Sequence, residues 1–135
     1  FHRQMLQNAD MVLIELQAEH LVRLSVWSAA WLVLTVVALA RRRPDPAVRS
    51  FWLVTALWCL INLAVAAFAA GNPTRDSGAL RGLLIGSEAF NVFCVLVGVA
   101  LARRPDGRLR GAGAAVAVQA AALLVLDGVL LSALL

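Results

Sequence analysis

Lysine is absent from this 135-residue sequence, so all twelve basic residues are arginines. Eight of them are confined to two short segments, residues 41–49 and 103–110, and each segment joins two apolar runs. A nucleic-acid-binding protein needs a basic face whose side chains reach the phosphates. Arginines at the ends of apolar runs do not form such a face, so we expect no nucleic-acid partner.

Common catalytic and redox patterns are also missing. Cys59 and Cys94 stand alone inside apolar runs, without CxxC or Cys/His spacing, so we interpret them as small apolar filler. The sequence contains no recognisable nucleophile–base pair and no phosphate-binding loop. We therefore expect no enzymatic activity and no cofactor.

A metal site is not indicated either. Glu15, Glu19 and His20 are close in the sequence, but their spacing matches no strong metal motif. Glu19 and Arg23 are instead spaced as an i,i+4 ion pair on a helix. We expect no bound metal.

The hydrophobic content is the strongest positive signal. Apolar residues make up 61% of the chain and the mean hydropathy is +0.82, whereas a soluble domain is about 45–50% apolar. A soluble domain of this length could not cover so much apolar surface. We therefore predict an integral membrane protein whose main partner is the lipid bilayer.

Four apolar runs are long enough to cross a bilayer, which takes about 20 residues. They cover about residues 22–40, 51–70, 82–102 and 111–134. Short connections make neighbouring helices antiparallel. The predicted fold is all-α, an up-down-up-down four-helix transmembrane bundle with residues 21–135 as its membrane domain.

Residues 1–20 are amphipathic rather than apolar, with Met5, Ala9, Val12 and Leu16 at helical spacing. They predict either a helix lying on the membrane surface or an extension of the next helix. A single straight helix over residues 1–40 would be about 60 Å long, twice the hydrocarbon core.

The two arginine-rich turns predict the topology. Cytoplasmic loops are enriched in basic residues, which would place both turns in the cytoplasm and both termini outside. The arginines that carry this prediction are Arg41, Arg42, Arg43, Arg103 and Arg104.

The turns also resemble each other, since Pro105 follows Pro44, and Arg110 follows Arg49, by 61 positions. This is compatible with a tandem repeat of two helical hairpins about an axis along the membrane normal. The alternative is that topology alone makes two cytoplasmic turns alike.

Each predicted span carries polar residues, which are costly in a bilayer and by default indicate a site. A rise of about 1.5 Å per residue places most of them at a comparable depth in the outer half. This polar layer comprises Ser28, Asn62, Glu88, Asn91 and Asp127, and Gln119 lies on the same helix as Asp127. The layer could bind a ligand or ion, bind a partner, or hold the helices together by hydrogen bonds.

Glu88 and Asp127 are the two carboxylates of this layer. Close together in a low dielectric they would share a proton, as a proton-coupled carrier requires. The simpler expectation for Glu88 is an ion pair with Arg81.

Glycines predict close helix packing, within the bundle or between subunits. Gly82 and Gly86 form a small-xxx-small step, and Gly111 and Gly113 open the fourth span. Gly98 belongs to the same set.

The segment 57–66, Leu-Trp-Cys-Leu-Ile-Asn-Leu-Ala-Val-Ala, together with Gly98-x-x-Leu101 and Gln119-x-x-x-Leu123-Leu124-x-x-Asp127, resembles an uncharacterised family of small bacterial four-helix membrane proteins. The resemblance implies the bacterial inner membrane and polar positions at Asn62, Gln119 and Asp127, but no known activity. Ser87 and Asn91 depart from the family, which usually has Asn and Asp there.

Three functions remain open on the sequence alone. The first is a non-enzymatic membrane protein whose polar layer binds a small ligand, a lipid headgroup or a partner helix. The second is a small oligomeric transporter or channel for protons or cations that uses Asp127 and Glu88. The third is an accessory subunit that packs through Gly82 and Gly86 onto a larger membrane complex.

Overall fold

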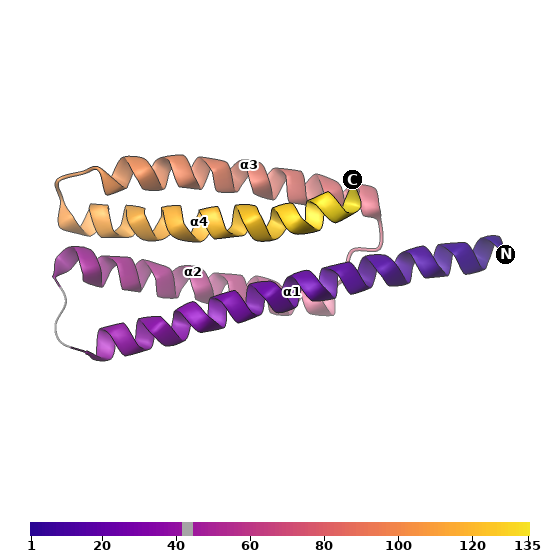
Figure 1. Ribbon diagram of the computed structural model, residues 1–135, viewed down its shortest axis with the longest axis horizontal. Coiled ribbons are helices and arrows are strands. Elements are labelled where there is room, and N and C mark those ends of the chain that lie inside the picture. Colours follow the sequence, from indigo (N-terminus) through magenta and orange to yellow (C-terminus); the bar gives the residue numbers. More distant parts are fainter. Residues whose placement is uncertain (42–44) are drawn as a thin grey trace.

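The computed structural model describes residues 1–41 and 45–135. The topology predictions for Arg42 and Arg43 therefore lie outside the described residues. Four helices follow one another, α1 (His2–Ala40), α2 (Pro46–Gly71), α3 (Ser77–Ala102) and α4 (Gly107–Leu134) (Figure 1). All four are long and apolar enough to cross a membrane. The predicted all-α, up-down four-helix architecture is confirmed.

Aspartates begin the three later helices. The Asp45 carboxylate accepts from the Val48 amide at 3.0 Å, and Pro46 occupies the first turn. Asp76 and Asp106 cap α3 and α4 in the same way. A side-chain acceptor satisfies amides that the first helical turn leaves free, so these helices begin about a turn before the predicted apolar spans.

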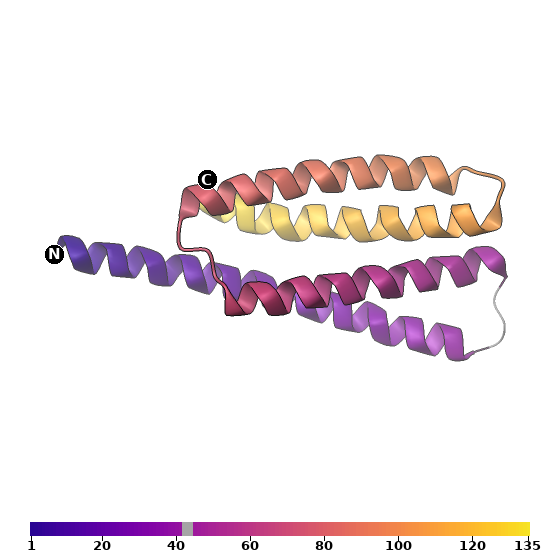
Figure 2. The same cartoon turned by 180° about the vertical axis from the view of Figure 1, so that it is seen from behind.

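The helices are ordered α1, α2, α4, α3 across the bundle (Figures 1 and 2). α4 packs along both α2 and α3, whereas α1 packs mainly on α2. Equivalent helices of the two hairpins, α2 and α4, therefore lie side by side in the middle. This is the arrangement that two equivalent hairpins would adopt, while their origin by duplication stays a prediction.

Residues 1–20 continue into the first span as one helix. α1 runs unbroken over 39 residues, and its N-terminal part projects beyond the other helices (Figure 1). Of the two alternatives for this segment, the structure shows the extension. Where this projecting part of α1 meets the bundle, Leu13 packs in a cluster with Leu80, Leu84 and Leu130.

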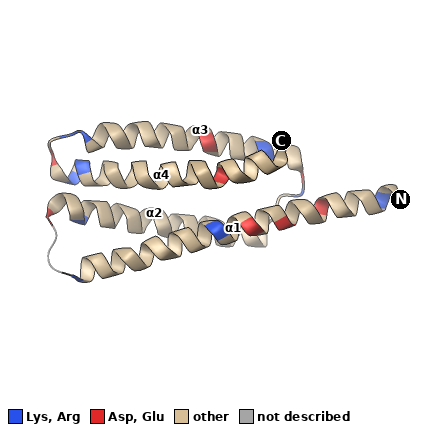
Figure 3. Ribbon diagram, viewed as in Figure 1, with Lys and Arg blue, Asp and Glu red and all other residues tan. Residues whose placement is uncertain are grey.

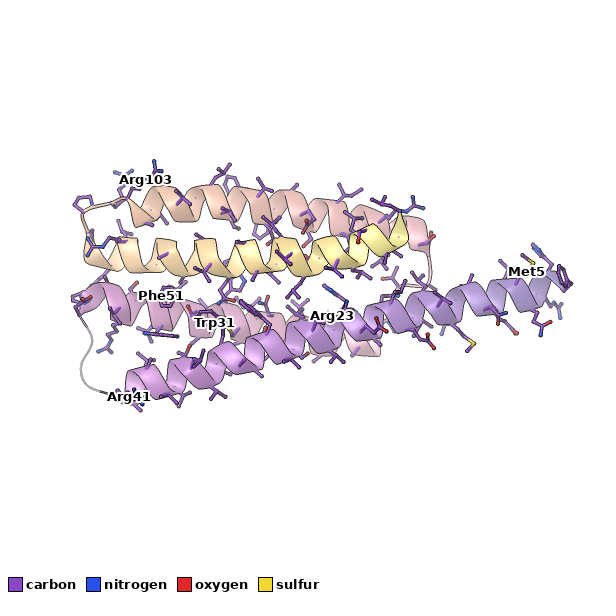
Figure 4. The ribbon with its side chains drawn as sticks, in the orientation of Figure 1. Met5, Arg23, Trp31, Arg41, Phe51 and Arg103 are labelled. Carbon is purple, nitrogen blue, oxygen red and sulfur yellow. The ribbon has the colours of Figure 1, made fainter. Side chains whose placement is uncertain are left out.

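The two ends of the bundle differ in charge (Figure 3). The end with Arg41, Arg49 and residues 103–110 is here called the arginine end, and the end with the link 72–76 the distal end. Beside the arginine end, Trp31 contacts Phe51 and Trp52, with ring centroids 6.4 and 6.1 Å apart (Figure 4). This aromatic contact fastens α1 to α2.

Three glycines let α4 lie close to its neighbours. A Cβ on Gly98 would fall 2.7 Å from the Gly113 carbonyl oxygen, and one on Gly113 would fall 2.5 Å from the Ala102 nitrogen. A Cβ on Gly111 would overlap the Ala47 carbonyl oxygen of α2. Only glycine fits at these contacts between backbones.

Gly82 and Gly86 lie differently from the other three glycines. A Cβ at either position would meet nothing within 4 Å in the described chain. Among the described residues, therefore, these two glycines do not serve the close helix packing that was expected inside the bundle. Close packing at these two glycines would require a helix of a neighbouring molecule.

Valine at Gly113 tests this difference, with valine at Gly86 as the control. We expect Gly113→Val to lower the free energy of unfolding by about 1–3 kcal/mol, because α4 must move away from α3. Gly86→Val should stay within about 0.5 kcal/mol of the parent protein. Reversible unfolding in mixed micelles, followed by circular dichroism, measures both. Equal losses of unfolding free energy in the two variants would contradict the close contact between α3 and α4 at Gly113.

Candidate functional site

Asp127 of α4 is a buried carboxylate that contacts three other polar side chains. Its Oδ1 lies 3.0 Å from the His20 Nε2 of α1. Its Oδ2 accepts hydrogen bonds from Ser87 Oγ at 2.8 Å and from Asn91 Nδ2 at 3.4 Å, both on α3. These four residues are called the Asp127 cluster, which joins three helices around one carboxylate.

Helical spacing explains how the cluster forms. Ser87 and Asn91 are four residues apart and therefore share the face of α3 that meets α4. His20 lies four residues before the buried Leu24 and eight before the buried Ser28, on the inner face of α1. His20 and Asp127 are 8% and 7% exposed, so their contact is formed inside the bundle.

A cavity of about 520 Å³ lies beside the Asp127 cluster, toward the distal end. Every helix contributes to its wall, and most of that wall is apolar, including Leu24, Trp58, Leu84 and Leu123. All four members of the cluster line it, as does Asn62 of α2. The cavity is therefore a mostly apolar space with a buried polar region at the Asp127 cluster.

The cavity opens sideways between α2 and α3. Ile61 and Val65 of α2 and Leu83 and Phe90 of α3 all line it, and each is more than half exposed. These residues form its mouth. In a bilayer such a mouth faces the hydrocarbon.

The distal side is held by Gln17 and Thr74. The Gln17 side chain accepts from the Thr74 amide at 2.9 Å and donates to the Thr74 carbonyl at 2.7 Å. Both hydrogen bonds fix the 72–76 link against α1, so the link forms one edge of the cavity.

The predicted polar layer divides into two levels. Asn62, Asn91 and Asp127 lie at the cavity. Gln119 is deeper, where its Oε1 accepts from the Trp27 Nε1 at 3.0 Å. Ser28, next to Trp27 in the chain, is fully buried and does not line the cavity.

Glu88 does not form the expected ion pair with Arg81, since no such pair occurs among the described residues. The contacts of the Asp127 oxygens are with His20, Ser87 and Asn91, and proton sharing between Glu88 and Asp127 stays a prediction. The Glu88 Oε2 points toward Gly128, 3.5 Å from where a Cβ would be. Adjacent positions on a helix point about 100° apart, so Ser87 joins the cluster and Glu88 does not.

Sequence reasoning missed His20 and Ser87. From the sequence, His20 is considered only as a metal ligand, yet the continuous helix carries it into the bundle. Its spacing from Leu24 and Ser28 was the signal that could have identified it. The expected i,i+4 ion pair between Glu19 and Arg23 is confirmed at 3.5 Å, on the exposed side of α1.

No group of three metal-ligating side chains occurs among residues 1–41 and 45–135. The cluster has the hydrogen-bonding pattern of a carboxylate surrounded by donors. It can orient a polar group of a ligand or hold helices together.

Four membrane-length helices around an apolar cavity define a multi-pass membrane protein. The chain belongs to a family of unknown function, DUF6992, whose pattern matches residues 23–128. The match covers the fold and every member of the Asp127 cluster except His20. No curated protein and no solved structure matches the chain.

A double-mutant cycle measures the His20–Asp127 contact. With His20→Phe, Asp127→Asn and the double variant, we expect a coupling free energy of about 0.6–1.7 kcal/mol, the range found for hydrogen bonds between membrane helices. Unfolding in mixed micelles gives the four values. The exposed Glu19–Arg23 pair, tested by Glu19→Gln and Arg23→Gln, should couple less. A coupling free energy of zero between His20 and Asp127 would contradict a stabilising contact between them.

Proposed function

We propose that this protein is a non-enzymatic membrane protein that binds a small ligand in the cavity beside Asp127. One observation carries the proposal, the combination of a cavity of about 520 Å³, mostly apolar walls and a buried polar cluster at Asp127. Ligand sites are typically concave, mostly apolar and about 300–1,000 Å³ in volume, with few polar groups that fix orientation.

Buried hydrogen-bonding atoms support this proposal. His20 Nδ1 and Asn62 Nδ2 are buried and have no hydrogen-bond partner among the described residues, and both side chains line the cavity. A polar group left unpaired in an apolar medium costs free energy. A ligand that pairs with these atoms gains both hydrogen bonds and apolar contact.

Close packing at the arginine end favours binding over transport through a single chain. Below the cavity, Ala115, Gln119 and Ala120 of α4 are fully buried, and Gly98 and Gly113 bring α3 and α4 into backbone contact. Among the described residues the cavity therefore ends in a packed core. A path between subunits is the transporter alternative, and it requires an oligomer.

The open face at Gly82 and Gly86 keeps the third function, an accessory subunit of a larger complex, as an alternative. Close approach of a partner helix needs small residues on an exposed face. Such a partner would bind α3 on the side away from α4.

For topology, we propose the bacterial inner membrane with the arginine end in the cytoplasm and both termini outside. A C-terminal alkaline phosphatase fusion should be active and a C-terminal green fluorescent protein fusion dark. Fusions after Gly107, at the arginine end, should show the reverse. The opposite pattern in both sets would invert the proposed orientation.

Native mass spectrometry tests the binding function. Protein extracted gently from its own membrane should carry a ligand of defined mass. Ala69→Phe places a larger side chain in the cavity wall and should abolish that mass. Ala64→Phe, an exposed position on the same helix outside the cavity, should keep it. If Ala69→Phe retains the ligand at full occupancy, or wild type carries none, the proposal is wrong.

A further inference from the structure

The hydrogen bonds of the Asp127 cluster define which of its atoms remain for a ligand. Asp127 accepts from Ser87 Oγ and Asn91 Nδ2 and lies 3.0 Å from His20 Nε2. A carboxylate only accepts, so this contact keeps a proton on Nε2. In the neutral imidazole, Nδ1 is then a hydrogen-bond acceptor.

Asn62 supplies the complementary group. Its Nδ2 is a donor with no partner among the described residues, and the residue is 8% exposed. The Gln17 side-chain amide, by contrast, is already paired with Leu13 and Thr74. Of the buried polar atoms without a partner among the described residues, two belong to side chains that line the cavity, an acceptor on α1 and a donor on α2.

The charges around the cavity select against ionised ligands. Asp127 lies in its wall, and no arginine of the described chain does. Arg23 is bound to Glu19 and is 46% exposed. A carboxylate or phosphate would thus face Asp127 in a low dielectric without a paired cation. For an ammonium, the Asp127 oxygens already accept from His20, Ser87 and Asn91, and its desolvation in an apolar cavity is costly.

The mouth between α2 and α3 restricts the chemistry of the rest of the ligand, the part that does not contact His20 and Asn62. Ile61, Val65, Leu83 and Phe90 border it, and all four are apolar and exposed. A molecule that enters here comes from the hydrocarbon of the bilayer and must itself be mostly apolar.

From these observations we infer that the ligand is a neutral lipid alcohol, an apolar chain or ring system that ends in a hydroxyl group. The hydroxyl donates to His20 Nδ1 and accepts from Asn62 Nδ2, and the apolar body fills the cavity toward the mouth. This assignment rests on the proposed binding function and names its ligand class. A hydroxyl is the smallest neutral group that satisfies a donor and an acceptor together.

Four probes with the same chain length separate the ligand classes. They are 1-tetradecanol, 2-tetradecanone, tetradecanoate and tetradecylammonium, titrated into the purified full-length chain and counted as bound adducts by native mass spectrometry. We expect the alcohol to bind about fivefold more tightly than the ketone, which cannot donate to Nδ1. The two ions should bind at least about 100-fold more weakly than the alcohol.

Two variants examine the role of Asn62. Asn62→Leu removes the free donor and should weaken tetradecanol binding about fivefold. Thr55→Val is the matched control, because Thr55 is also a buried residue of α2 with an unpartnered oxygen but does not line the cavity. It should leave the affinity unchanged. The alcohol-to-ketone ratio in the wild type tests His20 without a substitution that would leave Asp127 unpaired.

Each result has a distinct meaning. If the ketone binds as well as the alcohol, or an ion binds best, the hydroxyl assignment is wrong while the binding site stands. If no probe binds to the monomeric chain, or Ala69→Phe leaves the binding of every probe unchanged, the proposed function itself fails. A stable dimer that resists all four probes would assign the cavity to a second copy of the chain and overturn the inference.

Discussion

A carboxylate inside a bundle of apolar helices needs hydrogen-bond donors, because lipid supplies none. Asp127 finds them on two other helices, at His20 of α1 and at Ser87 and Asn91 of α3. These contacts make α4 the element around which the distal half is organised. They hold α1 against the hairpin of α3 and α4, although α1 packs mainly on α2.

α4 packs closely against its neighbours at the arginine end and less closely toward the distal end. At the arginine end, Gly111 and Gly113 bring α4 into contact with the backbones of α2 and α3. Toward the distal end α4 carries larger side chains, such as Leu123 and Leu130, and these line the cavity. α2 and α3 do not pack along each other. Because the larger side chains of α4 hold its neighbours further apart toward the distal end, space remains there between α2 and α3.

Several parts of the site were accessible from the sequence and others were not. Polarity within an apolar run identified Asn62, Asn91 and Asp127, all of which lie at the cavity. Depth along a helix could not separate them from Gln119, which bonds with Trp27 at a deeper level. Nor could it distinguish Ser87 from its neighbour Glu88, because only the rotation of α3 about its axis decides which of them faces α4.

The sequence by itself determined the class of protein and the number of helices. Those properties depend on local physics, namely the length of uncharged runs against the bilayer thickness. Only the tertiary structure decided that His20 meets Asp127 and that Asn62 faces the same cavity. Such meetings depend on the order and rotation of the helices, which are set by contacts between residues far apart in the chain.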